Sequence, residues 1–145
     1  MGKKRLATFV TAIALCIAAA APAGAKAQDP ILFVHGYVES ASLWNTMIGR
    51  FEKDGYPKSY LSAYSYNTSQ SNKIDAEEVK SRVETLLKNT GATKVDIVAH
   101  SMGSLNSRYY IKNLGGESKV DVWVSLGGPN HGTETANACF STSCV

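Results

Sequence analysis

The sequence lacks the excess of positive charge that a nucleic-acid-binding protein needs. The 145 residues include 15 Lys or Arg and 12 Asp or Glu, but four of the basic residues and none of the acidic ones precede residue 28. Residues 28–145 therefore hold 11 basic and 12 acidic residues, a net charge of −1. Binding to nucleic acid requires a basic face that neutralises phosphates, so we expect no nucleic-acid partner.

The sequence also lacks the motifs that hold metals and nucleotides. It contains no H-E-x-x-H, no paired C-x-x-C and no G-x-x-x-x-G-K-[ST], so we expect no metal and no other cofactor. Internal repeats and low-complexity tracts are absent as well. Low charge and recurring apolar runs exclude disorder, and the length suits one domain with a buried core.

No apolar run is long enough to span a membrane. The longest apolar stretch, Leu6–Ala21, has 16 residues and is rich in Ala, short of the roughly 20 that a bilayer requires. It follows Lys3-Lys4-Arg5 and precedes a segment that ends in Ala25-Lys26-Ala27, which is typical of a secretory signal peptide cleaved after residue 27. A lipid-modified Cys16 is disfavoured, because Leu15 stands where lipoprotein cleavage requires a small residue. We expect a secreted, extracellular protein whose residues 28–145 form the mature part.

Cysteine is scarce in the mature part, where only Cys139 and Cys144 occur. In an exported protein this spacing favours a local disulfide, which would stabilise the fold by roughly 2 kcal/mol. The alternative is that each cysteine pairs with another that is not in this sequence.

The mature part alternates short apolar segments with amphipathic ones. The pattern predicts strands at 31–34, 60–66, 95–99 and 120–126, and helices at 42–53, 75–89 and 102–113. Short connections between strand and helix are typical of a parallel sheet with helices on both faces, the α/β class. The last strand is too apolar for a comfortable exposed edge, so we expect something to cover it.

Ser101 lies where a buried strand passes into a helix, with small residues two positions before and after it, Ala99 and Gly103. A sharp strand-to-helix turn that projects one hydroxyl needs such small neighbours. The helix that begins after Ser101 would aim the Met102 N–H at charge developing on an attacked carbonyl. A serine in this place can also be a simple helix cap.

A second motif makes the nucleophile interpretation stronger. The buried strand 31–34 ends in His35-Gly36-Tyr37, the position from which hydrolases with this turn supply a second oxyanion donor, here the N–H of Tyr37. The two motifs stand in the order that such enzymes use.

These blocks resemble the small secreted bacterial lipases of the α/β-hydrolase superfamily, of the type with an Ala-His-Ser-Met-Gly turn. The resemblance runs from Pro30 to Thr133 and is carried by four blocks, Phe33–Gly36, Lys94–Gly103, Arg108–Leu114 and Ser125–Thr133, the last similar to the actinobacterial branch. It implies that Ser101 is the nucleophile and that the main-chain N–H groups of Tyr37 and Met102 form the oxyanion hole. It also implies that strand 31–34 lies beside strand 95–99.

The acid and base of a catalytic triad are harder to place. This fold orders its triad as Ser, acid, His, and after Ser101 the only acids are Glu117, Asp121 and Glu134 and the only histidine is His131. Asp121 lies near the start of its strand, far from the carboxyl ends where such sites lie, and Glu134 follows the histidine. We therefore expect the acid and base beyond Val145, a chain truncated at its C-terminus, and no useful ester turnover from these 145 residues alone. His131 is the weaker alternative as base.

The resemblance implies an ester lipid at an oil–water interface as substrate, most specifically a triacylglycerol, cleaved through an acyl-enzyme on Ser101. Tyr66 and His131 are candidates for lining the substrate pocket. His35 and His100 resemble structural residues that form hydrogen bonds to the loops. A carboxylesterase or polyester hydrolase is an alternative, as is a non-catalytic binding protein with the hydrolase fold. We expect a monomer.

Overall fold

The computed structural model describes residues 28–134. The expected signal peptide and the Cys139 and Cys144 pair lie outside these residues. In chain order the elements are β1 (Ile31–Val34), a 3₁₀ turn (Ala41–Trp44), α1 (Asn45–Lys53), a 3₁₀ turn (Lys58–Tyr60), β2 (Leu61–Ala63), α2 (Asn72–Thr90), β3 (Val95–His100), α3 (Gly103–Asn113), a 3₁₀ turn (Gly116–Ser118) and β4 (Val120–Leu126).

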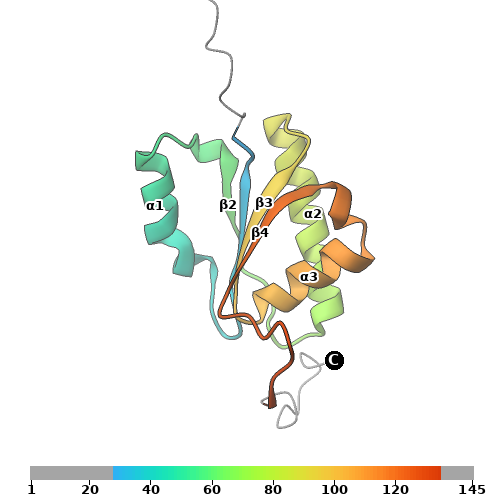
Figure 1. Cartoon of the computed structure of the whole chain (residues 1–145). Coiled ribbons are helices and arrows are strands. Elements are labelled where there is room, and N and C mark those ends of the chain that lie inside the picture. Colours follow the sequence, from blue (N-terminus) through green and yellow to red (C-terminus); the bar gives the residue numbers. More distant parts are fainter. Residues whose placement is uncertain (1–27, 135–145) are drawn as a thin grey trace, which may run out of the picture.

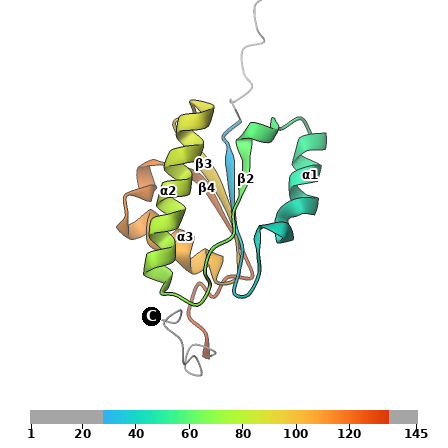
Figure 2. The same ribbon diagram turned by 180° about the vertical axis from the view of Figure 1, so that it is seen from behind.

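The four strands form one parallel sheet in the order β2-β1-β3-β4. Helix α1 covers one face, and α2 with α3 covers the other (Figures 1 and 2). This confirms the predicted α/β class with helices on both faces. It also places β1 directly beside β3, with Val34 paired to Ala99, as the family resemblance implied.

The residues of β1 alternate between two cores, which is why the whole strand is apolar. Leu32 and Val34 belong to the larger core under α2 and α3, whereas Ile31 and Phe33 pack with Trp44 on the α1 side. All four strand residues are almost fully buried. The strand that leads into His35-Gly36 is therefore packed on both of its faces.

Several element boundaries differ from the sequence prediction. The predicted helix 42–53 is a 3₁₀ turn (Ala41–Trp44) followed by α1. Strand 60–66 shortens to Leu61–Ala63, because Tyr64 and Tyr66 leave the ladder, the first to fill the larger core and the second to stack on His35. Helix 75–89 extends to Asn72–Thr90, since the Ser71 side chain caps its start by accepting a hydrogen bond from the Lys73 N–H. Gly91, at φ 71°, ends it as predicted.

Strand β4 forms one edge of the sheet and presents apolar side chains to solvent. Val122, Val124 and Leu126 are each more than a third exposed, while Trp123 between them packs against the core. Within residues 28–134 no helix has the length and apolar character needed to cross a membrane.

Asp75 is a buried acid in the first turn of α2, and we expect its charge to cost stability. It is 1% exposed; Oδ1 accepts a hydrogen bond from Gln70, and Oδ2 has no partner among the described residues. Burial raises the pKa of Asp75 above its usual 3.8 against the opposing Gln70 hydrogen bond, and the nearby charge of Glu78 adds to the rise.

The folded state therefore holds the Asp75 proton more tightly than the unfolded chain, so this group removes stability as the pH rises through its pKa. Asp75→Asn should raise the thermal midpoint at pH 7, and the gain should vanish near pH 3, where both states are protonated. Asp54→Asn, at an exposed position, is the matched control. A lower midpoint for Asp75→Asn at pH 7 would contradict this interpretation.

Candidate active site

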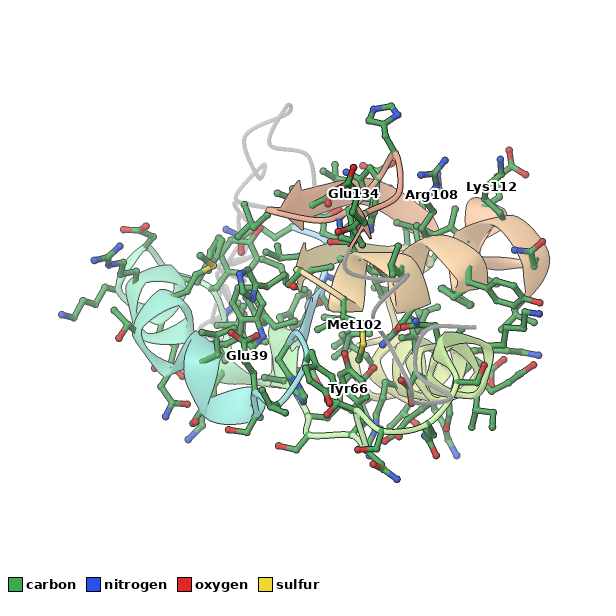
Figure 3. The ribbon with its side chains drawn as sticks, turned by 90° about the horizontal axis from the view of Figure 1, so that it is seen from below. Glu39, Tyr66, Met102, Arg108, Lys112 and Glu134 are labelled. Atoms are coloured by element: carbon green, nitrogen blue, oxygen red, sulfur yellow. The ribbon has the colours of Figure 1, made fainter. Side chains whose placement is uncertain are left out.

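The candidate site lies at the carboxyl ends of β1 and β3. These neighbouring parallel strands run directly into His35-Gly36-Tyr37 and His100-Ser101-Met102, so the two sequence motifs meet at one edge of the sheet. Figure 3 looks onto this edge, with Met102, Tyr66 and Glu39 gathered near its centre. In open α/β sheets this is the edge where ligands bind.

Ser101 has a backbone conformation that side chains other than glycine rarely adopt. Its φ is 50°, in the left-handed region. The turn is held from both sides, because the Ser101 N–H donates to Leu126 O at 3.0 Å and the Ser101 carbonyl accepts from the Ser104 N–H at 3.0 Å. Strain of this kind persists only where the surroundings impose it, and it is typical of a functional position. The Ser101 hydroxyl has no hydrogen-bond partner among residues 28–134.

The close packing around Gly103 explains why this position of the turn needs a residue without a side chain. A Cβ at this position would lie 2.4 Å from His35 O and 2.7 Å from Val34 O, far inside van der Waals contact. The crowding therefore comes from the backbone of β1, which the first turn of α3 approaches closely. Ala99, two residues before Ser101, is fully buried.

The two expected oxyanion donors are available. Neither the Tyr37 N–H nor the Met102 N–H donates to another group of the described residues. Met102 directly precedes α3, so its N–H stands at the positive end of that helix. An anion beside Ser101 could thus accept from two main-chain donors that have no other acceptor in this part of the chain.

Tyr66 and His35 hold the start of the loop that follows β1 and contains Gly36 and Tyr37, which we call the oxyanion loop. The His35 Nδ1–H donates to Gly36 O at 2.8 Å, its Nε2 accepts from the Tyr66 N–H at 3.3 Å, and the Tyr66 hydroxyl donates to His35 O at 2.6 Å. The two rings stack at 4.3 Å. Burial and then the negative charge of Asp75 raise the pKa of Tyr66, which keeps its hydroxyl a donor. Whether Tyr66 also lines an acyl pocket stays a prediction.

Tyr66→Phe should lower the stability of the protein by about 1–2 kcal/mol, because it leaves a backbone carbonyl at His35 without its donor. Thermal unfolding measures the loss. Tyr109→Phe is the matched control, since the Tyr109 hydroxyl has no hydrogen-bond partner among the described residues. Equal midpoints for the two variants would show that the Tyr66 hydroxyl bond contributes nothing.

Glu39 joins the site without any signal in the sequence. Its Oε2 accepts from the Gly36 N–H at 2.7 Å and from His100 Nδ1 at 2.8 Å. Glu39 and His100 are 61 positions apart in the sequence, so no sequence pattern indicates this contact. Like His35, His100 thus bonds to a loop, as its resemblance implied.

Comparison with known proteins identifies the family. The family model described as "Lipase (class 2)" matches residues 28–145. The chain belongs to the lipase (class 2) family. Among curated relatives it is 34% identical over 123 residues to phospholipase A(1) LCAT3 of Arabidopsis thaliana, and 26% identical over 137 residues to a triacylglycerol lipase of Burkholderia plantarii. These alignments cover 81% and 90% of this chain, but 27% and 38% of the relatives.

Solved structures agree with the fold of the lipase (class 2) chain. The mature form of Bacillus licheniformis lipase BlEst2 superposes with a TM-score of 0.68 at 25% identity, covering 78% of this chain and 46% of that one. The chain therefore spans less than half the length of each of these three proteins.

The histidine and acids that follow Ser101 do not complete a triad in the described part of this lipase-family chain. His131 and Glu134 are exposed in the loop after β4, and neither contacts the Ser101 hydroxyl; Glu117 is exposed in the turn before β4. Asp121 lies at the opposite, amino end of the sheet, as predicted. There its carboxylate oxygen comes within 4.8 Å of those of Asp29 and Asp96, and Lys94 Nζ lies 3.6 Å from Asp121 Oδ1.

Proposed function

We propose that this chain carries the nucleophile and the oxyanion hole of a secreted hydrolase of carboxylic esters, most specifically a triacylglycerol lipase. The observation that carries the proposal is the strained turn at Ser101, φ 50°, beside two main-chain N–H groups that donate to no acceptor within residues 28–134. Membership of the lipase (class 2) family supports the reaction class, and the relative from Burkholderia plantarii supports the substrate.

The reaction would proceed by two acyl transfers. Ser101 Oγ attacks the ester carbonyl carbon and loses its proton to a general base, and the resulting oxyanion accepts hydrogen bonds from the Tyr37 and Met102 N–H groups. Collapse of this intermediate releases the alcohol, which takes up the proton, and leaves an acyl-enzyme. Water then attacks the acyl carbonyl, the bond from the acyl carbon to Ser101 Oγ breaks, a proton of the water returns to Oγ, and the fatty acid is released. Among residues 28–134 no histidine reaches the Ser101 hydroxyl, so the base is not assigned.

The surroundings of the oxyanion loop favour an apolar substrate. Tyr37 and Val38 directly follow the His-Gly pair and are 49% and 78% exposed. Val38 has φ 51°, a strained conformation for a β-branched residue, and its N–H donates to the Thr68 hydroxyl at 3.2 Å. The chain thus holds an apolar side chain in solvent beside the proposed oxyanion hole, where an acyl chain or a lipid surface could cover it. Secretion is proposed from residues 1–27.

Hydrolysis rates on a series of acyl esters test the proposed substrate. The protein is expressed from its complete coding sequence. Soluble short-chain esters, emulsified long-chain triacylglycerols and a phosphatidylcholine dispersion should be compared. We expect hydrolysis of the triacylglycerols, lost in Ser101→Ala. If only short soluble esters are hydrolysed, the protein is a carboxylesterase and not a lipase. If Ser101-dependent cleavage is seen with the phospholipid alone, a phospholipase is favoured.

A further inference from the structure

Glu39 connects the two segments that form the proposed site. It follows β1 in the loop that contains Gly36 and Tyr37, and Figure 3 labels it at the carboxyl edge of the sheet. Its Oε2 accepts two hydrogen bonds, one from the Gly36 N–H at 2.7 Å and one from His100 Nδ1 at 2.8 Å. One carboxylate oxygen therefore ties the oxyanion loop to the nucleophile turn.

Each donor directly precedes a residue of the proposed machinery. Gly36 precedes Tyr37, whose N–H is one oxyanion donor, and His100 precedes the nucleophile Ser101. The contact leaves no room for a side chain at position 36, where a Cβ would lie 2.8 Å from both Glu39 Oε2 and Ser101 Cβ. The carboxylate bonds the N–H of the His35–Gly36 peptide, one peptide before the Tyr37 N–H, so its loss would free this segment to shift relative to Ser101.

The charge state of Glu39 suits this contact. Burial works to raise its pKa, but the hydrogen bonds from His100 and Gly36, together with the electrostatic interaction with His100, outweigh it and leave the pKa below the usual 4.5. The carboxylate is thus ionised at neutral pH. Hydrogen bonds to an ionised acceptor are stronger than those to a neutral one. The Glu39 and His100 side chains are both only partly exposed.

We propose that Glu39 is a positioning residue, which holds the Tyr37 N–H at a fixed place relative to Ser101 by bonding both Gly36 and His100. The inference rests on the proposed function of the site. Glu39 does not touch the reacting atoms. It acts through the geometry of the oxyanion hole, so its loss should lower kcat more than it changes KM.

Kinetics of the protein expressed from its complete coding sequence test the proposal. Glu39→Ala should lower kcat about 10- to 100-fold with KM within about threefold, because a misplaced oxyanion donor costs transition-state binding. Glu39→Gln keeps an acceptor for the Gly36 N–H and should recover a large part of that loss. Glu52→Ala, an exposed acid on α1, should leave both constants unchanged.

A second measurement does not depend on turnover. The Gly36 amide should exchange its proton at least about tenfold faster in Glu39→Ala than in the parent, while amides of β3 are unaffected. Unchanged kcat in Glu39→Ala, or unchanged Gly36 exchange, overturns the positioning role. If the parent shows no hydrolysis that depends on Ser101, the proposed function fails instead, and the exchange rate alone decides whether Glu39 fixes the loop.

Discussion

Ser101→Ala should lower ester hydrolysis by about 10⁴-fold or more in the protein expressed from its complete coding sequence. The hydroxyl is the atom that would form the acyl-enzyme, and within residues 28–134 the N–H groups of Tyr37 and Met102 donate to no other acceptor. Alanine removes that atom while the turn keeps its backbone hydrogen bonds to Leu126 and Ser104. Initial rates on an emulsified triacylglycerol measure the effect.

The matched control is Ser81→Ala, an exposed serine on α2, which should hydrolyse the ester at the parent rate. Both variants should unfold near the parent temperature, because neither removes buried contacts. Substantial hydrolysis by Ser101→Ala would assign the chemistry to another nucleophile. A parent protein without hydrolysis would favour a binding protein that keeps the hydrolase fold.

Gly103→Ala should damage stability and activity together. The new methyl group would lie 2.4 Å from His35 O and 2.7 Å from Val34 O, and backbone atoms of a buried strand cannot move aside. Helix α3 must therefore shift away from β1, at a cost of about 1–3 kcal/mol. The shift carries the Met102 N–H with it, so kcat should fall as well.

Gly49→Ala provides the comparison, because this glycine lies in α1 and a Cβ there meets nothing within 4 Å. Alanine favours a helix interior by roughly 0.5–1 kcal/mol over glycine, so this variant should unfold at the same or a higher temperature. Thermal unfolding of both variants checks the pair. If Gly103→Ala is as stable as Gly49→Ala, the close approach of α3 to β1 is not what position 103 requires.

Most of the fold could be predicted from the pattern of apolar residues. Apolar runs such as 31–34 and 95–99 are buried on both faces, so their composition is nearly sufficient to identify them as central parallel strands. The Ser101 turn and the His-Gly loop could also be located, because each needs small residues at fixed offsets from a strand end. The predicted strand 60–66 is too long, because Tyr64 and Tyr66 pack against the core and His35 and do not pair in the sheet.

The contacts that stabilise the site could not be predicted in the same way. Glu39 meets His100, and Tyr66 meets His35, only after the sheet has formed, and neither pair has a sequence spacing set by a helix or strand. The buried acid Asp75 was also hidden, because an acid in the first turn of a helix suggests a solvated residue that complements the dipole.

Reaction with a serine-directed fluorophosphonate tests the central claim most directly. The protein expressed from its complete coding sequence should be treated with the probe, digested and analysed by mass spectrometry. We predict one adduct, on the peptide that contains Ser101, formed by the folded protein and abolished by prior denaturation or by Ser101→Ala. An ester-hydrolysing protein that carries the adduct on another residue, or carries none, would contradict the assignment of Ser101 as the nucleophile.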